Sequence, residues 1–242
     1  MKKVAIIDSG SGGVNVLLNC IKQCKNCNYL LLIDDKNLPY GNKTEIQLKK
    51  IAFALIERLN SFFKPDIVVI GCNTLTSVCI EDLRACFKDI FFIGSEPALK
   101  PALKEFVRND ILVLATSVTI NNCKILNDYK NICFCPPELP KVIDDNLFER
   151  EKILDYLEKH LDFTKPKAVV LGCTHFEGIQ EELSKVLGKP KFFLSSEGIA
   201  SRLRSQNLKG NSFQVQIMTT SLRSDQIKFY SYFKYRLNQF LE

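Results

Sequence analysis

Two cysteines stand at the ends of segments that nearly repeat each other. The segment KPDIVVIGCNT covers Lys64–Thr74, and KPKAVVLGCTH covers Lys165–His175, at a constant offset of 101 residues. Each copy ends a Val- and Ile-rich run with Gly-Cys, which places Cys72 and Cys173 at the ends of two predicted buried strands. Both thiols are followed by hydrogen-bonding residues, namely Asn73, Thr74, Thr174 and His175. Because ligands bind beyond the carboxyl ends of parallel strands, both thiols are candidates for chemistry.

Paired thiols at such positions suit proton transfer. A helix is predicted to start just after each cysteine, and the N-terminus of a helix lowers the pKa of a nearby thiol. If the two copies face each other across a cleft, Cys72 and Cys173 reach a small molecule from opposite sides. Two opposed acid/base groups can remove a proton from one face of a carbon and return one to the other, which inverts the centre. The alternatives are a redox disulfide between the two residues or two buried structural cysteines.

Other strand ends also carry polar residues. The first predicted strand ends in DSGSGG, with Asp8 and Ser9 before a glycine turn whose N–H groups could meet an anion. Asn15 occupies the place of the third glycine in G-x-G-x-x-G, so a nucleotide site is weakly indicated. In the second copy LATSVTI offers Thr119 as a carboxylate contact or a helix cap, and in LPYGNKT Tyr40 is a ligand contact or an ordinary turn aromatic.

Composition and charge exclude several classes of protein. The 242 residues are 46% hydrophobic and 25% charged, which is ordinary for a globular chain. The net charge of +6 is spread without a basic block, so we expect no nucleic-acid partner. No apolar run reaches the roughly 18 residues of a membrane span, and no signal peptide is recognisable. We therefore expect a cytoplasmic protein whose ten cysteines are thiols.

The remaining pattern predicts the elements that position these residues. Short apolar runs alternate with helical stretches, which is typical of a doubly wound α/β fold with parallel sheets. The predicted strands are Val4–Ile7, Tyr29–Ile33, Ile67–Ile70, Ile90–Ile93, Ile111–Leu114, Ile132–Phe134, Ala168–Leu171 and Lys191–Leu194. The predicted helices include Thr44–Phe63, Leu75–Phe87, Asp145–Leu161, Phe176–Leu187 and Asp225–Phe240.

The repeat extends beyond the cysteine segments. FFIGSE at Phe91–Glu96 matches FFLSSE at Phe192–Glu197, again at an offset of 101. A shared offset predicts two pseudo-symmetric doubly wound domains with the active site in the cleft between them. We expect residues 1–93 plus about 208–242 to form the first α/β domain, and residues 94–207 to form the second.

These motifs identify a family. DSGSGG, PYG, GCNT and GCTH occur in this order at domain-sized spacing, and together they closely resemble the glutamate racemases of the aspartate/glutamate racemase superfamily. The resemblance runs from Val4 to about Arg204. Further familial stretches are the Glu-Pro pair at Glu96 and SSEGIASRL from Ser195.

The resemblance implies an isomerase that needs no cofactor or metal and interconverts L- and D-glutamate with two catalytic cysteines. Cys72 and Cys173 match these cysteines, assisted by Asp8 and His175 respectively. The family's substrate-binding positions carry over onto Asp8, Ser9, Tyr40, Gly41, Asn73, Thr74, Thr119, Thr174 and His175. The resemblance further implies a cytoplasmic homodimer whose partner is glutamate, with no membrane contact, that supplies D-glutamate for peptidoglycan.

Some positions depart from the family pattern. Glu177 stands where the family commonly has proline, and a family glutamate falls on Ile143, beside two aspartates, so no site residue is placed there. Cys20, Cys24 and Cys27 resemble the spacing of an iron–sulfur motif, but their expected place on one helical face favours a structural role.

Three other functions stay open. A racemase of aspartate or hydantoins, or a maleate-type isomerase with a nucleophilic cysteine, would use the same fold. A non-catalytic module that binds an anion would need no paired thiols. A dithiol redox protein would form a disulfide between Cys72 and Cys173 under mild oxidant.

Overall fold

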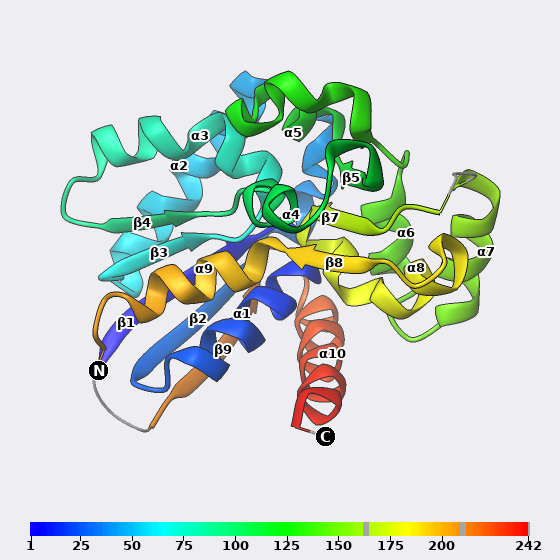
Figure 1. The fold of residues 1–242 in the computed structure, drawn as a ribbon. Coiled ribbons are helices and arrows are strands. Elements are labelled where there is room, and N and C mark those ends of the chain that lie inside the picture. Colours follow the sequence, from blue (N-terminus) through cyan, green and yellow to red (C-terminus); the bar gives the residue numbers. More distant parts are fainter. Residues whose placement is uncertain (162–164, 209–211, 242) are drawn as a thin grey trace.

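The chain folds as an α/β protein on two parallel sheets (Figure 1). A computed structural model describes residues 1–161, 165–208 and 212–241. In these residues the strands form one sheet ordered β4-β3-β1-β2-β9 and another ordered β6-β5-β7-β8. The strands are β1 (Lys2–Asp8), β2 (Cys27–Ile33), β3 (Ile67–Ile70), β4 (Phe91–Gly94), β5 (Ile111–Ala115), β6 (Cys133–Phe134), β7 (Ala168–Gly172), β8 (Lys191–Leu194) and β9 (Gln214–Thr219). The predicted α/β class is confirmed.

Helices surround both sheets and bury the inner strands β1, β3 and β7 on both faces. The α-helices are α1 (Gly12–Gln23), α2 (Glu45–Phe62), α3 (Asn73–Cys86), α4 (Leu99–Glu105), α5 (Ser117–Asn122), α6 (Leu139–Asp145), α7 (Arg150–His160), α8 (Gln180–Leu187), α9 (Ser195–Arg204) and α10 (Arg223–Leu241). Short 3-10 helices are η1 (Asp35–Asn37), η2 (Tyr40–Asn42), η3 (Arg108–Asp110), η4 (Lys124–Ile132) and η5 (Thr174–Ile179).

The central strand β1 shows how the sequence pattern arises. Val4 and Ile6 belong to one buried cluster with side chains of α1, whereas Ala5 and Ile7 belong to a second cluster with side chains of α2 and α3. Successive strand residues point to opposite faces, and both faces are covered, so the strand is apolar throughout. Since β1 lies between β2 and β3, its last residue, Asp8, reaches the middle of the sheet edge.

The repeated segments form equivalent parts of the two sheets, with one difference. Both β3 and β7 pair in parallel with the edge strand that follows them, β4 or β8. Ile67 pairs with Phe91, but its counterpart Ala168 pairs with Lys191, one residue earlier than the repeat predicts. The two copies therefore share their topology and differ in strand register.

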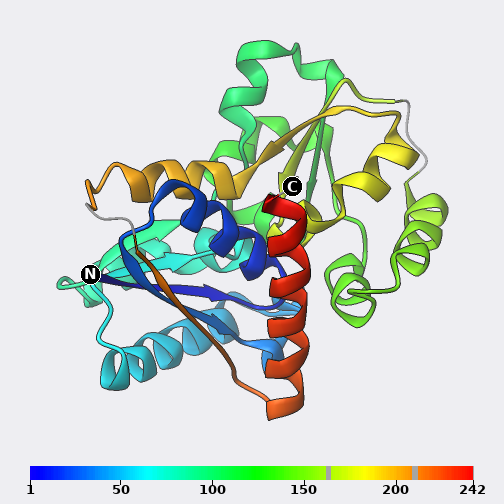
Figure 2. The same ribbon diagram turned by 90° about the horizontal axis from the view of Figure 1, so that it is seen from below.

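The tail adds to the first sheet. β9 pairs in parallel with β2, and α10 lies against α1 (Figure 2). The division into domains at residues 93 and 208 stays a prediction. In the described part of the chain, no helix is both long and apolar enough to cross a membrane.

Two predicted helices are wrong in extent. The stretch 145–161 is divided between α6 and α7, because Asn146 leaves the helical conformation without any Gly or Pro to signal the break. The stretch 176–187 begins as the 3-10 helix η5 and becomes α-helical only at Gln180. Gly178, a poor helix former, lies in the 3-10 part.

The cysteine trio does not share a helical face. Cys20 lies in α1, Cys24 caps the end of that helix and Cys27 begins β2. The sulfurs of Cys24 and Cys27 are 3.5 Å apart. In the residues described, no group of three His, Cys, Asp or Glu side chains is placed to hold a metal ion.

Candidate active site

The ends of three central strands bring the predicted catalytic residues together. Asp8 ends β1, Cys72 follows β3 as the N-cap of α3, and Cys173 follows β7 just before η5. Asp8 has no exposed surface, and each thiol-bearing residue is only 6% exposed. The two sheets therefore meet at a closed polar centre in which both thiols are nearly shielded from solvent.

Cys72 lies in surroundings that oppose its ionisation. Burial raises the pKa of the Cys72 thiol, and the charges of Asp8 and Cys173 raise it further. The backbone amides of Thr74 and Leu75, at the start of α3, lower it by less. The low pKa expected from the helix N-terminus is therefore wrong for Cys72, because the effect of burial outweighs that of the amide contacts.

Cys173 is paired with a histidine. Its sulfur lies 3.7 Å from Nδ1 of His175, which is 2% exposed. On the other side of the ring, Nε2 lies 3.5 Å from Oδ1 of Asp144, too far for a normal hydrogen bond. Burial lowers the pKa of His175, but the facing carboxylate of Asp144 and the Cys173 sulfur together raise it well above its usual value.

Asp144 is the functional candidate that the sequence did not single out. It lies in α6, is 2% exposed, and accepts hydrogen bonds from the Ser11 amide at 3.1 Å and from the Ser11 hydroxyl. Ile143, onto which the family glutamate falls, is instead fully buried in the apolar core. The only signal in the sequence was that Asp144 directly follows Ile143. The structure shows that Asp144 faces His175.

Asp8 is hydrogen-bonded to the residue that follows Cys173. One of its oxygens accepts a hydrogen bond from the Thr174 hydroxyl at 3.0 Å, and the other accepts one from the Gly10 amide at 3.2 Å. Burial raises the pKa of Asp8 to about 6, although the charge of His175 and these hydrogen bonds lower it. Asp8 therefore titrates near neutral pH, the range that suits an acid/base group.

The remaining predicted residues surround this centre. Asn73 donates to the Ser195 hydroxyl at 3.0 Å, whereas its buried Oδ1 has no hydrogen-bond donor. The hydroxyls of Thr74 and Thr119 are linked at 3.3 Å, and that of Thr116 lies within 2.9 Å of both. This buried amide oxygen is an acceptor without a donor, which a buried polar atom normally has.

The structure brings only some of the predicted substrate contacts near Tyr40 close to the thiols. The Tyr40 hydroxyl donates to Asp34 at 2.7 Å, so it is engaged away from the thiols. Burial and the Asp34 carboxylate raise its pKa well above the usual value, and the charges of Cys72 and Asp8 also act on it. Gly41 packs against Thr116, where an added Cβ would lie 3.1 Å from that side chain. Ser9 is buried next to Asp8.

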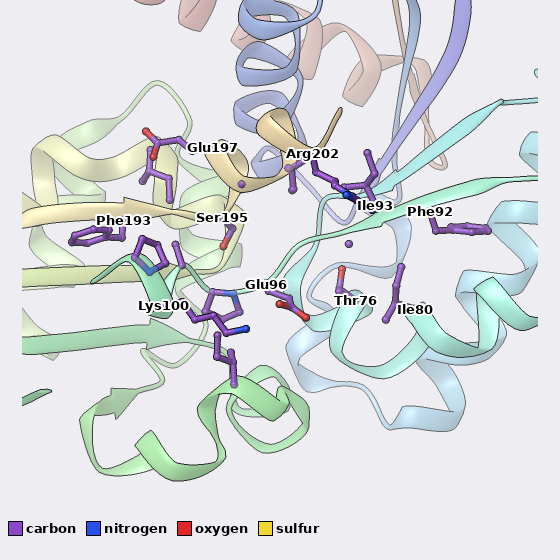
Figure 3. A pocket seen from close by; sticks show the side chains of 18 of the residues that line it. Thr76, Ile80, Phe92, Ile93, Glu96, Lys100, Phe193, Ser195, Glu197 and Arg202 are labelled. Carbon is purple, nitrogen blue, oxygen red and sulfur yellow. The ribbon is translucent and has the colours of Figure 1, made fainter. Parts of the chain in front are cut away.

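A separate large pocket lies beside this centre. It has a volume of about 1150 Å³ and is bordered by the edge strands β4 and β8 (Figure 3). Neither thiol lines it, but Thr76 and Ser195 do. We place the chemistry at the buried strand ends, because the titratable groups converge there and not in the pocket.

Fold and site define a class: two-sheet α/β enzymes with acid–base residues converging from the central strands of both sheets. No protein-family model matches the chain. It is 38% identical over 224 residues to a glutamate racemase of Clostridium novyi, covering 88% of this chain and 86% of that one. It is 36% identical over 215 residues to glutamate racemase 2 of Bacillus subtilis, covering 84% and 80%.

Solved structures of glutamate racemases have a similar fold. Glutamate racemase from Campylobacter jejuni matches with a TM-score of 0.79 at 23% identity, covering 96% of this chain and 98% of that one. Escherichia coli glutamate racemase, in complex with L-glutamate and the activator UDP-MurNAc-Ala, matches with a TM-score of 0.78 at 25% identity, covering 96% and 95%. The chain belongs to the glutamate racemase family and is an isomerase of the amino-acid racemase class.

Proposed function

We propose that this chain interconverts L-glutamate and D-glutamate by two-base proton transfer, without a cofactor, using Cys72 and Cys173. The observation that carries the proposal is the convergence of two nearly buried thiols with Asp8 and His175 between the two sheets. Relatives named glutamate racemase support the choice of substrate.

The balance of protons follows from the two-thiol arrangement. One cysteine, as thiolate, takes the α-proton from one face of glutamate. The other, as thiol, delivers its proton to the opposite face. After one turnover the two sulfurs have exchanged protonation states, so the enzyme is set for the reverse reaction until protons exchange with water. The sulfurs therefore act as a coupled pair.

The two sulfurs face groups of different charge. The raised pKa of His175 favours its imidazolium form, and the ring lies 3.7 Å from the Cys173 sulfur. Burial and the charge of Asp8 raise the pKa of Cys72 and so keep its thiol protonated. An opposite charge within about 4–6 Å favours the charged form. We infer that the His175 ring assists proton removal by Cys173, and that each cysteine is the base for one enantiomer of glutamate and the acid for the other.

Developing negative charge on the substrate must be stabilised before a thiolate can remove an α-proton. The hydroxyls of Thr74 and Thr119 would donate to the substrate carboxylates, whereas the Thr174 hydroxyl donates to Asp8. The unpaired Oδ1 of Asn73 would accept from the α-ammonium group. Because water is excluded from the closed site, each of these interactions is strengthened.

The test uses L-glutamate and D-glutamate separately, in deuterated water and under reducing conditions, without added cofactor. Optical rotation and α-deuteration are followed together. We expect both reactions to converge on the same racemic, α-deuterated mixture. Folded protein that exchanges no α-proton of glutamate, but racemises aspartate, would assign a different substrate within the same superfamily.

The proposed setting is the cytoplasm, where the product supplies D-glutamate for peptidoglycan. Cells depleted of this protein should then require external D-glutamate for growth.

We also propose a homodimer. Leu222, Ile227 and Tyr230, in or next to α10, are 73%, 60% and 46% exposed, an apolar surface that a second copy would cover. Sedimentation at micromolar concentration would reveal the dimer.

A further inference from the structure

Glu177 is a buried carboxylate that the two-thiol mechanism does not use. It lies in η5, two residues after His175, and is 2% exposed. One oxygen accepts from the Ser196 amide at 3.0 Å, and the other accepts from the Ser196 hydroxyl. A buried carboxylate is costly unless such hydrogen bonds compensate it, so this position has a specific structural demand.

These bonds fasten the start of α9 to the segment that carries His175. No side chain of the preceding residues caps α9, so Glu177 accepts one of the amides that the helix leaves unpaired. The Ser196 hydroxyl is also fixed from a third element, because it accepts from Asn19 of α1 at 2.9 Å. Ser196, at the start of α9, is therefore bonded by both Glu177 of η5 and Asn19 of α1.

Ser195, next to Ser196, links the start of α9 to residues beside both thiols. Ser195, the first residue of α9, accepts the Asn73 amide hydrogen bond at 3.0 Å. The Ser195 hydroxyl donates to the carbonyl of Leu171 in β7 at 3.1 Å. Asn73 adjoins Cys72, and Leu171 lies two residues before Cys173. A shift of the start of α9 would thus move contacts next to both sulfurs.

We propose that Glu177 is a positioning residue that, through Ser195, fixes Asn73 and the ends of the two thiol-bearing strands for catalysis. The proposal rests on the proposed racemisation of glutamate. A displacement of about 1 Å by a residue away from the chemistry can lower a rate about 10²-fold. Ser195 also faces the large pocket, whereas Glu177 does not line it, so the effect is transmitted through the protein interior (Figure 3).

The test compares Glu177→Ala, which removes the acceptor, with Glu177→Gln, which keeps an acceptor oxygen for the Ser196 amide. We expect Glu177→Ala to lower kcat about tenfold or more and to raise KM for glutamate about threefold or more, because Asn73 is displaced. Glu177→Gln should stay within about threefold of the wild type. Partial unfolding would lower apparent kcat and leave KM unchanged. Glu197→Gln, which removes the same charge at an exposed position of α9, is the matched control.

Ser195→Ala decides whether Glu177 acts through Ser195. We expect Ser195→Ala and Glu177→Ala to lower kcat/KM to a similar extent, and the double variant to be little worse than either. Losses that multiply in the double variant, or a folded Glu177→Ala enzyme with wild-type KM and kcat, would overturn the proposal. If Glu177→Ala does not fold, Ser196→Ala takes its place, with wild-type kinetics again overturning the proposal. A wild type inactive on glutamate would instead refute the proposed function.

Discussion

The two sulfurs differ in the charge that each one faces. The negative charge of Asp8 acts on Cys72, whereas Cys173 lies 3.7 Å from the imidazole of His175. This asymmetry lets one thiol be charged while the other is protonated, which a two-base reaction needs in each direction. A symmetric pair of equally buried thiols would hold both protons and would have no base.

We expect Cys72→Ser and Cys173→Ser each to lower kcat about 10²- to 10⁴-fold, because a hydroxyl is a far weaker base than a thiolate. Racemisation from both enantiomers is the measurement. Cys86→Ser, at an exposed cysteine, is the control and should retain full activity. A Cys72→Ser or Cys173→Ser enzyme with more than a tenth of wild-type kcat would contradict the two-base scheme.

Asp144 sets the charge of His175. Its carboxylate favours the imidazolium and, with the Cys173 sulfur, raises the pKa of His175 above its usual value against the effect of burial. We expect Asp144→Asn to lower that pKa, so that the proton is lost at a lower pH and Cys173 loses its neighbouring cation. NMR titration of the imidazole measures the change, with exposed His160, the second of the two histidines, as internal reference. An unshifted titration of His175 would show that Asp144 is not the cause.

At the scale of elements, α1 and η5 pack so closely that a methyl group does not fit between them. A Cβ on Gly12 would lie 2.2 Å from the Thr174 hydroxyl and 2.7 Å from the His175 amide nitrogen. We expect Gly12→Ala to destabilise the fold by about 1–3 kcal/mol and to reduce activity by moving His175. Urea unfolding and racemisation are the measurements.

Gly198→Ala is the matched control for this contact. Gly198 lies inside α9, and an added Cβ there meets nothing within 4 Å. Since alanine is the better helix former, we expect this change to stabilise the protein by about 0.5–1 kcal/mol without loss of activity. Equal destabilisation by both variants would show that close packing of α1 on η5 is not the reason.

The contact between η5 and α9 should make stability depend on pH. Burial raises the pKa of Glu177 from 4.5 to about 7, although its hydrogen bonds to Ser196 lower it and nearby Glu197 raises it. The folded state therefore holds a proton that the unfolded state has lost between these pH values, so the stability contribution of Glu177 falls as pH rises through this window. The loss is at most about 3 kcal/mol.

Glu177→Gln removes this titration. We expect the unfolding free energy of the wild type to fall relative to that of the variant between about pH 5 and pH 8. Urea titrations of both proteins at several pH values measure the difference. A constant difference across this range would mean that Glu177 titrates normally in the folded protein.

Sequence reasoning succeeded where local pattern determines structure. Parallel strands bring their carboxyl ends to one edge, so the apolar runs that precede Asp8 and Cys72 place both at the same sheet edge, and the repeat predicted an equivalent position for Cys173 in the second sheet. It failed at Asp144, because the start of α6 depends on Glu138 in a left-handed conformation, which no local motif signals. It also failed for the pKa of Cys72, because burial is a property of the whole fold.

At the scale of the molecule, the described site is closed. Contacts between elements of the two sheets cross it, including the Thr174–Asp8 hydrogen bond at 3.0 Å and an exposed one from Asn42 to Glu138 at 2.9 Å. With each thiol-bearing residue only 6% exposed, we expect glutamate to reach the sulfurs only when such contacts open. Substrate entry would then involve a motion of one sheet's loops relative to the other's.

Alkylation of the thiols reports this opening. We expect Cys72 and Cys173 to react with N-ethylmaleimide far more slowly than exposed Cys86, because both must wait for the open state. Glutamate should slow both further by holding the site closed, and Asn42→Ala should speed them by removing one closing contact. Mass spectrometry of the labelled peptides separates the sites. If Cys72 and Cys173 react as fast as Cys86 with or without glutamate, the site is open in solution, and the water exclusion that strengthens the proposed proton transfer must come from the substrate itself.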